Sequence, residues 1–148
     1  MPELYFAYAS NMDPMQFHCR CPKAKPLGRA RLPERRLAFT RCSRRWRGGV
    51  ADVVEDASSA VWGVLYEVDE ACLATLDRCE GVCKGAYRRE QVKVFHYAGQ
   101  PQEAITYVAN RTGDFRPSRS YLEVILRGAR AYGLPAEYIA ALERIKTV

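Results

Sequence analysis

A strand-forming run that leads directly into a capped helix is the strongest structural signal in this sequence. Residues 60–68, AVWGVLYEV, combine the β-branched, aromatic and aliphatic side chains that favour a buried strand. Asp69 follows as a helix N-cap with Glu70 in the first turn, and Gly81 ends the helix predicted over residues 69–81. A fold that accommodates this junction has to pack a helix against a sheet.

The order of the other predicted elements indicates an α+β protein. Strands are expected in residues 3–10, in one or two pieces of residues 25–41 broken near Pro33, in a short stretch after a loop at Gly48–Gly49, and in a hairpin made of residues 87–97 and 103–110 around the turn AGQPQ. Helices are expected over residues 13–20 with Asp13 as N-cap, over residues 118–133 with Ser118 as N-cap, and over residues 134–146. We therefore expect one domain, residues 1–148, with a small mixed β-barrel-like sheet and helices packed outside it.

Composition excludes several classes of protein. The chain has 148 residues, of which 48% are hydrophobic and 27% are charged, as expected for one globular domain rather than a disordered chain. No apolar run approaches the roughly 20 residues of a membrane-spanning helix. The first residues, MPELYFAYASN, lack the basic and apolar segments of a signal peptide. We therefore expect a cytoplasmic location and no membrane partner.

The six cysteines are expected to be free thiols, because the sequence shows no secretion signal. His18, Cys19 and Cys21 form a cluster that invites a metal-site interpretation. The remaining cysteines do not complete any known zinc spacing. We therefore expect no metal and no other cofactor.

Basic residues concentrate in one segment. The net charge is +6, and eight arginines lie between Arg29 and Arg47. Such a segment raises the question of nucleic-acid binding. The arginines alternate with apolar residues in a strand-like pattern, so we interpret the segment as a solvated basic strand and loop that favours anionic small molecules. Nucleic acid is not an expected partner.

Glu80 is the first residue that suggests chemistry. Leu73, Leu76 and Glu80 share one face of the predicted helix, and Glu80 lies at its C-terminal end, where the helix dipole disfavours a carboxylate. One interpretation is that the last turn frays and the side chain reaches water. The other is that Glu80 is a general acid/base in a half-buried pocket.

A second candidate is the strand end YASN, Tyr8–Asn11. A buried strand that ends in a polar turn exposes backbone N–H groups, and Ser10 and Asn11 add side-chain donors. Tyr87 follows the Glu80 helix, and Tyr121 lies in the first turn of a later helix. No nucleophile-elbow, P-loop or dinucleotide motif is present. An enzyme of this sequence would thus rely on a carboxylate, backbone donors and tyrosine hydroxyls.

Five segments, in this order, carry a resemblance to a known family: LYFAYASN, WRGGVADV, VWGVLYEV, LDRCEGVCKGAYRREQVKV and PSRSYLEVILRGARAYGLPAEY. Together they resemble the γ-glutamylcyclotransferase family over nearly the whole chain. The resemblance implies a β-barrel-like fold and a reaction without cofactor or metal. In that reaction the α-amino group of a γ-glutamyl unit attacks its own γ-carbonyl, which forms 5-oxoproline and releases an amino acid. The resemblance also allows a homodimer.

The resemblance assigns roles to seven residues. Glu80 is implied as the catalytic acid/base, while the γ-glutamyl substrate is bound by Tyr8, Ala9, Ser10, Asn11, Tyr87 and Tyr121. Ala9 replaces the glycine of the family motif, and its methyl group disfavours a positive φ. Asn11 favours the branch that acts on γ-glutamyl amino acids. The alternatives are another γ-glutamyl donor, such as a γ-glutamylamine, glutathione or a biosynthetic intermediate, or a non-catalytic γ-glutamyl-binding module.

Overall fold

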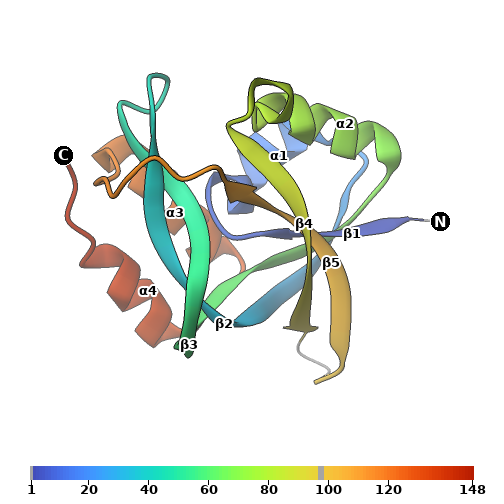
Figure 1. Cartoon of the computed structure of the whole chain (residues 1–148). Coiled ribbons are helices and arrows are strands. Elements are labelled where there is room, and N and C mark those ends of the chain that lie inside the picture. Colours follow the sequence, from blue (N-terminus) through green and yellow to red (C-terminus); the bar gives the residue numbers. More distant parts are fainter. Residues whose placement is uncertain (1, 97–98) are drawn as a thin grey trace.

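The computed structural model describes residues 2–96 and 99–148 and shows a closed β-barrel with helices outside it (Figure 1). The strands are β1 (Glu3–Ala7), β2 (Lys25–Ser43), β3 (Gly48–Val68), β4 (Tyr87–His96) and β5 (Pro101–Ala109). They follow one another around the barrel in the order β1-β3-β2-β4-β5. A parallel pairing of β1 with β5, at Tyr5 and Ile105, closes the barrel. The predicted α+β barrel is confirmed.

The helices begin at residues whose side chains or backbones favour helix starts. They are α1 (Pro14–Arg20), α2 (Glu70–Cys79), α3 (Arg119–Ala131) and α4 (Ala136–Glu143), with short 3-10 turns η1 (Ser10–Met12) and η2 (Val82–Lys84). The Asp69 carboxylate accepts a hydrogen bond from the Cys72 N–H, and the Ser118 hydroxyl accepts one from the Tyr121 N–H. Asp13 precedes α1 but pairs with Arg127 instead of capping the helix. Within the described ranges, no helix is long and apolar enough to cross a membrane.

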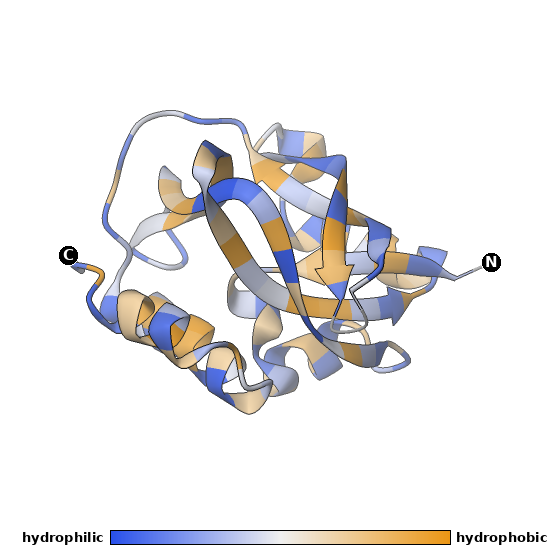
Figure 2. Ribbon diagram, turned by 90° about the horizontal axis from the view of Figure 1, so that it is seen from below, coloured by the Kyte–Doolittle hydropathy of each residue, from blue (hydrophilic) through white to orange (hydrophobic). Residues whose placement is uncertain are grey.

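Apolar side chains from the strands and from α2 and α3 form the core. Polar and apolar residues alternate along the strands (Figure 2), as expected for a sheet with one buried face. Leu73 and Leu76 of α2 and Ile125 of α3 are fully buried. This packing fixes the end of α2 and the start of α3 relative to the barrel, which matters for the site described below.

Of the one or two strands expected around Pro33, the structure forms one, because β2 runs through this residue. The pairing register with β3 shifts between Pro33 and Arg35, and Glu34 adopts a positive φ of 62°. A bulge of this kind inserts an extra residue without ending the strand.

The expected loop at Gly48–Gly49 is also wrong, since both glycines begin β3 and the turn comes just before them. A Cβ atom on Gly48 would lie 2.7 Å from the Ser118 nitrogen, and one on Gly49 would lie 2.8 Å from the Phe115 Cβ. The glycines therefore serve the close packing of the segment before α3 on the strand, rather than a turn.

The expectation of free thiols is wrong for two of the cysteines. Cys21, just after α1, forms a disulfide with Cys72 of α2 across 51 residues of sequence. Cys19 is exposed and free, and the described residues hold no group of three or more His, Cys, Asp or Glu side chains placed to bind a metal. In the predicted hairpin, β5 begins at Pro101, inside the expected turn; Tyr97 and Ala98 lie outside the described residues.

Candidate active site

A cavity of about 320 Å³ opens beside the C-terminal end of α2. All seven residues predicted from the sequence line it: Tyr8, Ala9, Ser10, Asn11, Glu80, Tyr87 and Tyr121. They come from the end of β1, from η1, from the end of α2, from the start of β4 and from the first turn of α3. The fold thus brings together segments that are more than a hundred residues apart in sequence.

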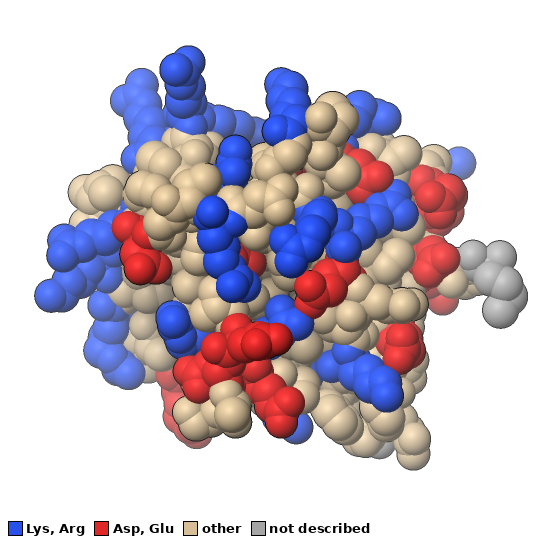
Figure 3. Space-filling view, viewed as in Figure 1, with Lys and Arg blue, Asp and Glu red and all other residues tan. Residues whose placement is uncertain are grey.

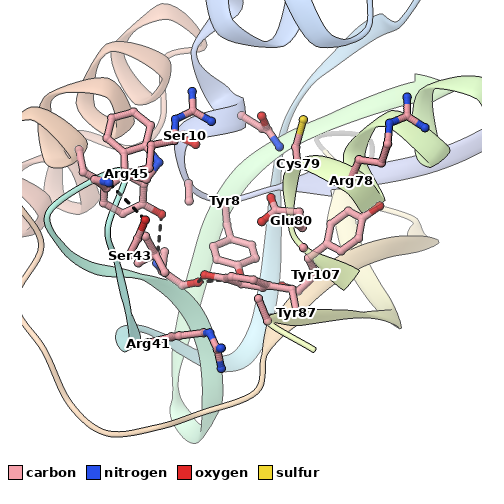
Figure 4. A pocket seen from close by; sticks show the side chains of 18 of the residues that line it. Tyr8, Ser10, Arg41, Ser43, Arg45, Arg78, Cys79, Glu80, Tyr87 and Tyr107 are labelled. Carbon is pink, nitrogen blue, oxygen red and sulfur yellow. Dashed lines mark hydrogen bonds between the residues drawn. The ribbon is translucent and has the colours of Figure 1, made fainter. Parts of the chain in front are cut away.

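Glu80 is the C-cap residue of α2, and its N–H donates to the Leu76 carbonyl at 2.8 Å. Leu73 and Leu76 bury the same helix face in the core. The Glu80 carboxylate points into the cavity toward Tyr8 (Figure 4). Burial raises the pKa of Glu80 from 4.5 to about 7, and the nearby Arg20 cation opposes this rise. The geometry therefore favours the acid/base interpretation over a frayed, hydrated helix end.

The backbone of Ala51, in β3, holds two of the predicted tyrosines. The Tyr87 hydroxyl donates a hydrogen bond to the Ala51 carbonyl at 2.5 Å, and the Tyr121 hydroxyl accepts one from the Ala51 N–H at 3.0 Å. Tyr8 donates to the Tyr107 carbonyl at 2.6 Å. Burial raises the pKa of all three predicted tyrosines, so their hydroxyls stay protonated at neutral pH.

A buried aspartate fixes this part of β3. Asp52 is fully buried, and its carboxylate accepts hydrogen bonds from the Thr40 hydroxyl and from the Ala109 N–H. It also pairs with Arg111 at 2.7 Å. Because a buried carboxylate is stable only with such partners, this network holds Ala51, and with it the tyrosines, in place.

Four hydroxyl groups in the cavity accept a hydrogen bond from the protein and keep their own proton. Tyr121 accepts from the Ala51 N–H, as described, and Tyr5 accepts from the Asn11 side-chain amide at 3.0 Å. Ser10 accepts from the Gln16 amide at 2.8 Å, and Ser43 accepts from the Trp46 N–H at 3.2 Å. In the described part of the chain, none of these four hydroxyls donates a hydrogen bond to a protein acceptor. The cavity therefore presents hydrogen-bond donors to a ligand.

The Asn11 side chain orders the turn at the end of β1. Besides donating to Tyr5, its amide oxygen accepts from Arg20 at 2.8 Å and from Gln16 at 3.2 Å. Ala9 has a φ of −132°, outside the left-handed region that favours glycine. The alanine in place of the family's glycine thus fits this backbone without a positive φ.

Sequence reasoning missed the basic residues of the cavity, which are Arg20, Arg41, Arg45, Arg78 and Lys84. Arg41 and Arg45 belong to the arginine-rich segment, but no sequence signal distinguishes them from the arginines there that face solvent. Tyr5 and Trp46 also line the cavity and were not predicted. Glu80 is the one carboxylate among the described lining residues, so the cavity carries excess positive charge.

Comparisons with known proteins give a consistent result. Residues 60–142 match the model of the AIG2-like family. The chain is 35% identical over 147 residues to the gamma-glutamylcyclotransferases of Mus musculus and of Homo sapiens, covering 97% of this chain and 78% of each relative. A solved structure of a gamma-glutamyl cyclotransferase superposes with a TM-score of 0.96 at 33% identity, covering 100% of this chain and 90% of that one.

Proposed function

Because the chain belongs to the γ-glutamylcyclotransferase family and is a cyclotransferase enzyme, we propose that it converts γ-glutamyl amino acids to 5-oxoproline and free amino acids. The observation that carries this proposal is the carboxylate of Glu80, which has a pKa of about 7 and faces a cavity rich in hydroxyl donors. The reaction needs one group that both accepts and donates a proton at neutral pH, and Glu80 has that property.

Glu80 acts first as a base. The α-ammonium group of the γ-glutamyl unit transfers a proton to the Glu80 carboxylate, which frees the nitrogen lone pair. The amine then attacks the γ-carbonyl carbon and forms a tetrahedral intermediate with a negative oxygen. Glu80 returns this proton to the leaving nitrogen, and the original amide C–N bond breaks as the carbonyl re-forms. The attacking nitrogen still carries two protons and loses one of them through Glu80 to the released amine, so the products are the neutral lactam and the amino acid with its ammonium group. A pKa near 7 serves these transfers better than the ordinary value of 4.5.

Hydroxyl donors stabilise the intermediate and orient the substrate. Tyr121, Tyr5 and Ser10 have protons available for the developing oxyanion or for a substrate carboxylate. The N–H groups of Ser10 and Asn11 lead the turn η1 and so have no partner within it. Since nucleophile and electrophile belong to one molecule, a cavity that holds the substrate folded supplies much of the acceleration.

Two alternatives carry less support. The same chemistry on a γ-glutamylamine, on glutathione or on a biosynthetic intermediate would use the same residues, and the residue type at Asn11 argues for γ-glutamyl amino acids. A non-catalytic γ-glutamyl-binding module was suggested by Ala9 alone, and the φ of −132° there means that the alanine needs no left-handed backbone conformation.

Other features follow from the proposal and stay predictions. The lyase-type formation of 5-oxoproline connects the enzyme to glutathione metabolism. A cytoplasmic location is tested by cell fractionation, a homodimer by light scattering of the purified protein, and the one-domain organisation of residues 1–148 by limited proteolysis.

Product analysis on a panel of donors tests the function. The purified protein is incubated with γ-glutamyl-alanine, ε-(γ-glutamyl)-lysine and glutathione, and 5-oxoproline is quantified by mass spectrometry. We expect the fastest release from γ-glutamyl-alanine and none from α-glutamyl-alanine, the control without a γ-linkage. Release from glutathione or ε-(γ-glutamyl)-lysine alone would contradict the substrate assignment.

A further inference from the structure

The cavity walls hold an unbalanced set of charges. Among the residues that the structure describes, five basic side chains line the cavity, against the single carboxylate of Glu80. In the described part of the chain, none of the five forms a salt bridge with a carboxylate. Elsewhere on the barrel, arginines such as Arg35 and Arg89 do pair with carboxylates. The cavity therefore keeps cationic groups that the protein itself does not neutralise.

Three of the five are directed toward protein oxygens. Arg20 donates to the Asn11 side chain at 2.8 Å, and Arg41 donates to the Asn110 carbonyl at 3.0 Å. Arg78 donates to the Thr75 hydroxyl at 3.2 Å. In Figure 4 the Arg41 guanidinium group points away from Glu80. These three cations are thus occupied by structural contacts.

Arg45 and Lys84 keep their charged groups available. Arg45 lies in the exposed turn between β2 and β3, with its guanidinium carbon 5.4 Å from the centre of the Trp46 ring, and Lys84 lies in η2 after the Glu80 helix. Neither charged group donates to an acceptor in the described residues. Figure 3 shows Lys and Arg side chains along the edge of the molecule formed by the β2–β3 turn and the loop after α2. The cavity mouth therefore carries positive charge next to the β2–β3 turn and next to η2.

The substrate's own charges indicate what these cations serve. A γ-glutamyl amino acid with a neutral side chain carries two carboxylates and one ammonium group. A γ-glutamyl dipeptide with glutamate or aspartate in the leaving position carries one further carboxylate. That carboxylate lies at the far end of the leaving group, while the reacting amide lies at Glu80, deeper in the cavity.

Building on the function above, we propose that the preferred substrates have an acidic leaving residue, glutamate or aspartate, whose side-chain carboxylate is bound by Arg45 together with Lys84. Because both cations are exposed, the attraction is that of a solvent-screened ion pair. We expect a preference of about three- to tenfold, larger at low salt than at high salt.

The matched pair γ-glutamyl-glutamate and γ-glutamyl-glutamine tests this inference, since the two differ in charge and hardly in shape. Steady-state kinetics give kcat/KM for both donors with the wild type, Arg45→Gln and Arg44→Gln. Arg44 is an exposed neighbour in the same turn that does not line the cavity, so its replacement makes the same change in net charge. We expect the wild type to favour the glutamate donor through KM. Arg45→Gln should lower the ratio of the two kcat/KM values toward one, with Lys84 left to hold a weaker preference, and Arg44→Gln should leave the ratio unchanged.

Two results would overturn the inference. One is a wild type that does not favour the glutamate donor; the other is an equal loss of preference in both variants, which would show a general effect of surface charge. In either case, release of 5-oxoproline from the glutamine donor would leave the proposed function intact. If no donor gave 5-oxoproline, the proposed function would fail, and calorimetric binding of the two dipeptides to wild type and Arg45→Gln would decide the inference on its own.

Discussion

Replacing Glu80 by glutamine should stabilise the protein, and it should do so at alkaline pH. The Glu80 carboxyl has a pKa of about 7 in the folded protein, against an ordinary value of 4.5. Between these two values the folded state binds more protons than the unfolded state, so stability falls as the pH rises. Below pH 4.5 both states are protonated and the effect vanishes. Above pH 7 the folded protein bears the full cost of an ionised, partly buried carboxylate.

The pKa rise sets the size of the effect. At about 1.4 kcal/mol per pKa unit, it corresponds to at most about 3 kcal/mol at pH 8 and to about 1 kcal/mol at pH 5. Glutamine resembles the protonated carboxyl in shape and never ionises. We therefore expect Glu80→Gln to be more stable than the wild type by up to about 3 kcal/mol at pH 8, with a much smaller gain at pH 5.

Equilibrium unfolding in urea at the two pH values, at one ionic strength, measures this difference. Glu123→Gln is the control, because Glu123 is an exposed glutamate of α3 outside the cavity. A Glu80→Gln protein that gained no more stability at pH 8 than at pH 5 would refute the buried, proton-binding carboxylate. So would a control variant that gained as much at pH 8.

Three further predictions follow from the structure. The kcat/KM of the wild type should fall as the pH drops below about 7, because the proposed base Glu80 becomes protonated, and the decline should fit the titration of a single group. A pH–rate profile without this decline would contradict the role proposed for Glu80. Gly128→Ala should destabilise the protein by about 1–3 kcal/mol and raise KM, because a Cβ atom there would lie 2.4 Å from the Met12 backbone and displace the turn at the end of β1. Urea unfolding measures the stability and steady-state kinetics measure KM; an unchanged stability and KM would show that the turn has room to move. Reduction of the Cys21–Cys72 disulfide should lower the free energy of unfolding by up to about 4 kcal/mol, since the bond closes a loop across a sequence separation of 51; urea unfolding with and without dithiothreitol tests this, and a Cys21→Ser/Cys72→Ser protein should not respond to the reductant.

Local signals in the sequence predicted the elements around the site. Asp69 and Ser118 cap α2 and α3 through bonds to N–H groups three residues on, and Gly81 ends the α2 helix in a left-handed conformation. Each of these interactions spans only a few residues, so the sequence pattern carries them. The placement of Glu80 beside Leu73 and Leu76 follows from helix periodicity in the same way.

Long-range contacts could not be predicted in this way. Gly48 and Gly49 resemble a loop in sequence, and only the distant segment that packs on them explains their place in a strand. Ala51 orients Tyr87 and Tyr121 through its backbone, so its side chain gives no signal of that role. The Cys21–Cys72 pair and the convergence of five basic residues on one cavity likewise depend on how the helices and turns meet around the barrel.

The most direct test of the account compares 5-oxoproline release from γ-glutamyl-alanine by the wild type and by Glu80→Gln. The variant keeps the shape of the side chain and removes its ability to accept a proton. We expect steady release by the wild type and a loss of at least about a hundredfold in the variant, with its fold intact by circular dichroism. Equal rates in the two proteins would mean that Glu80 does not move the proton, and the mechanism proposed for this cavity would be wrong.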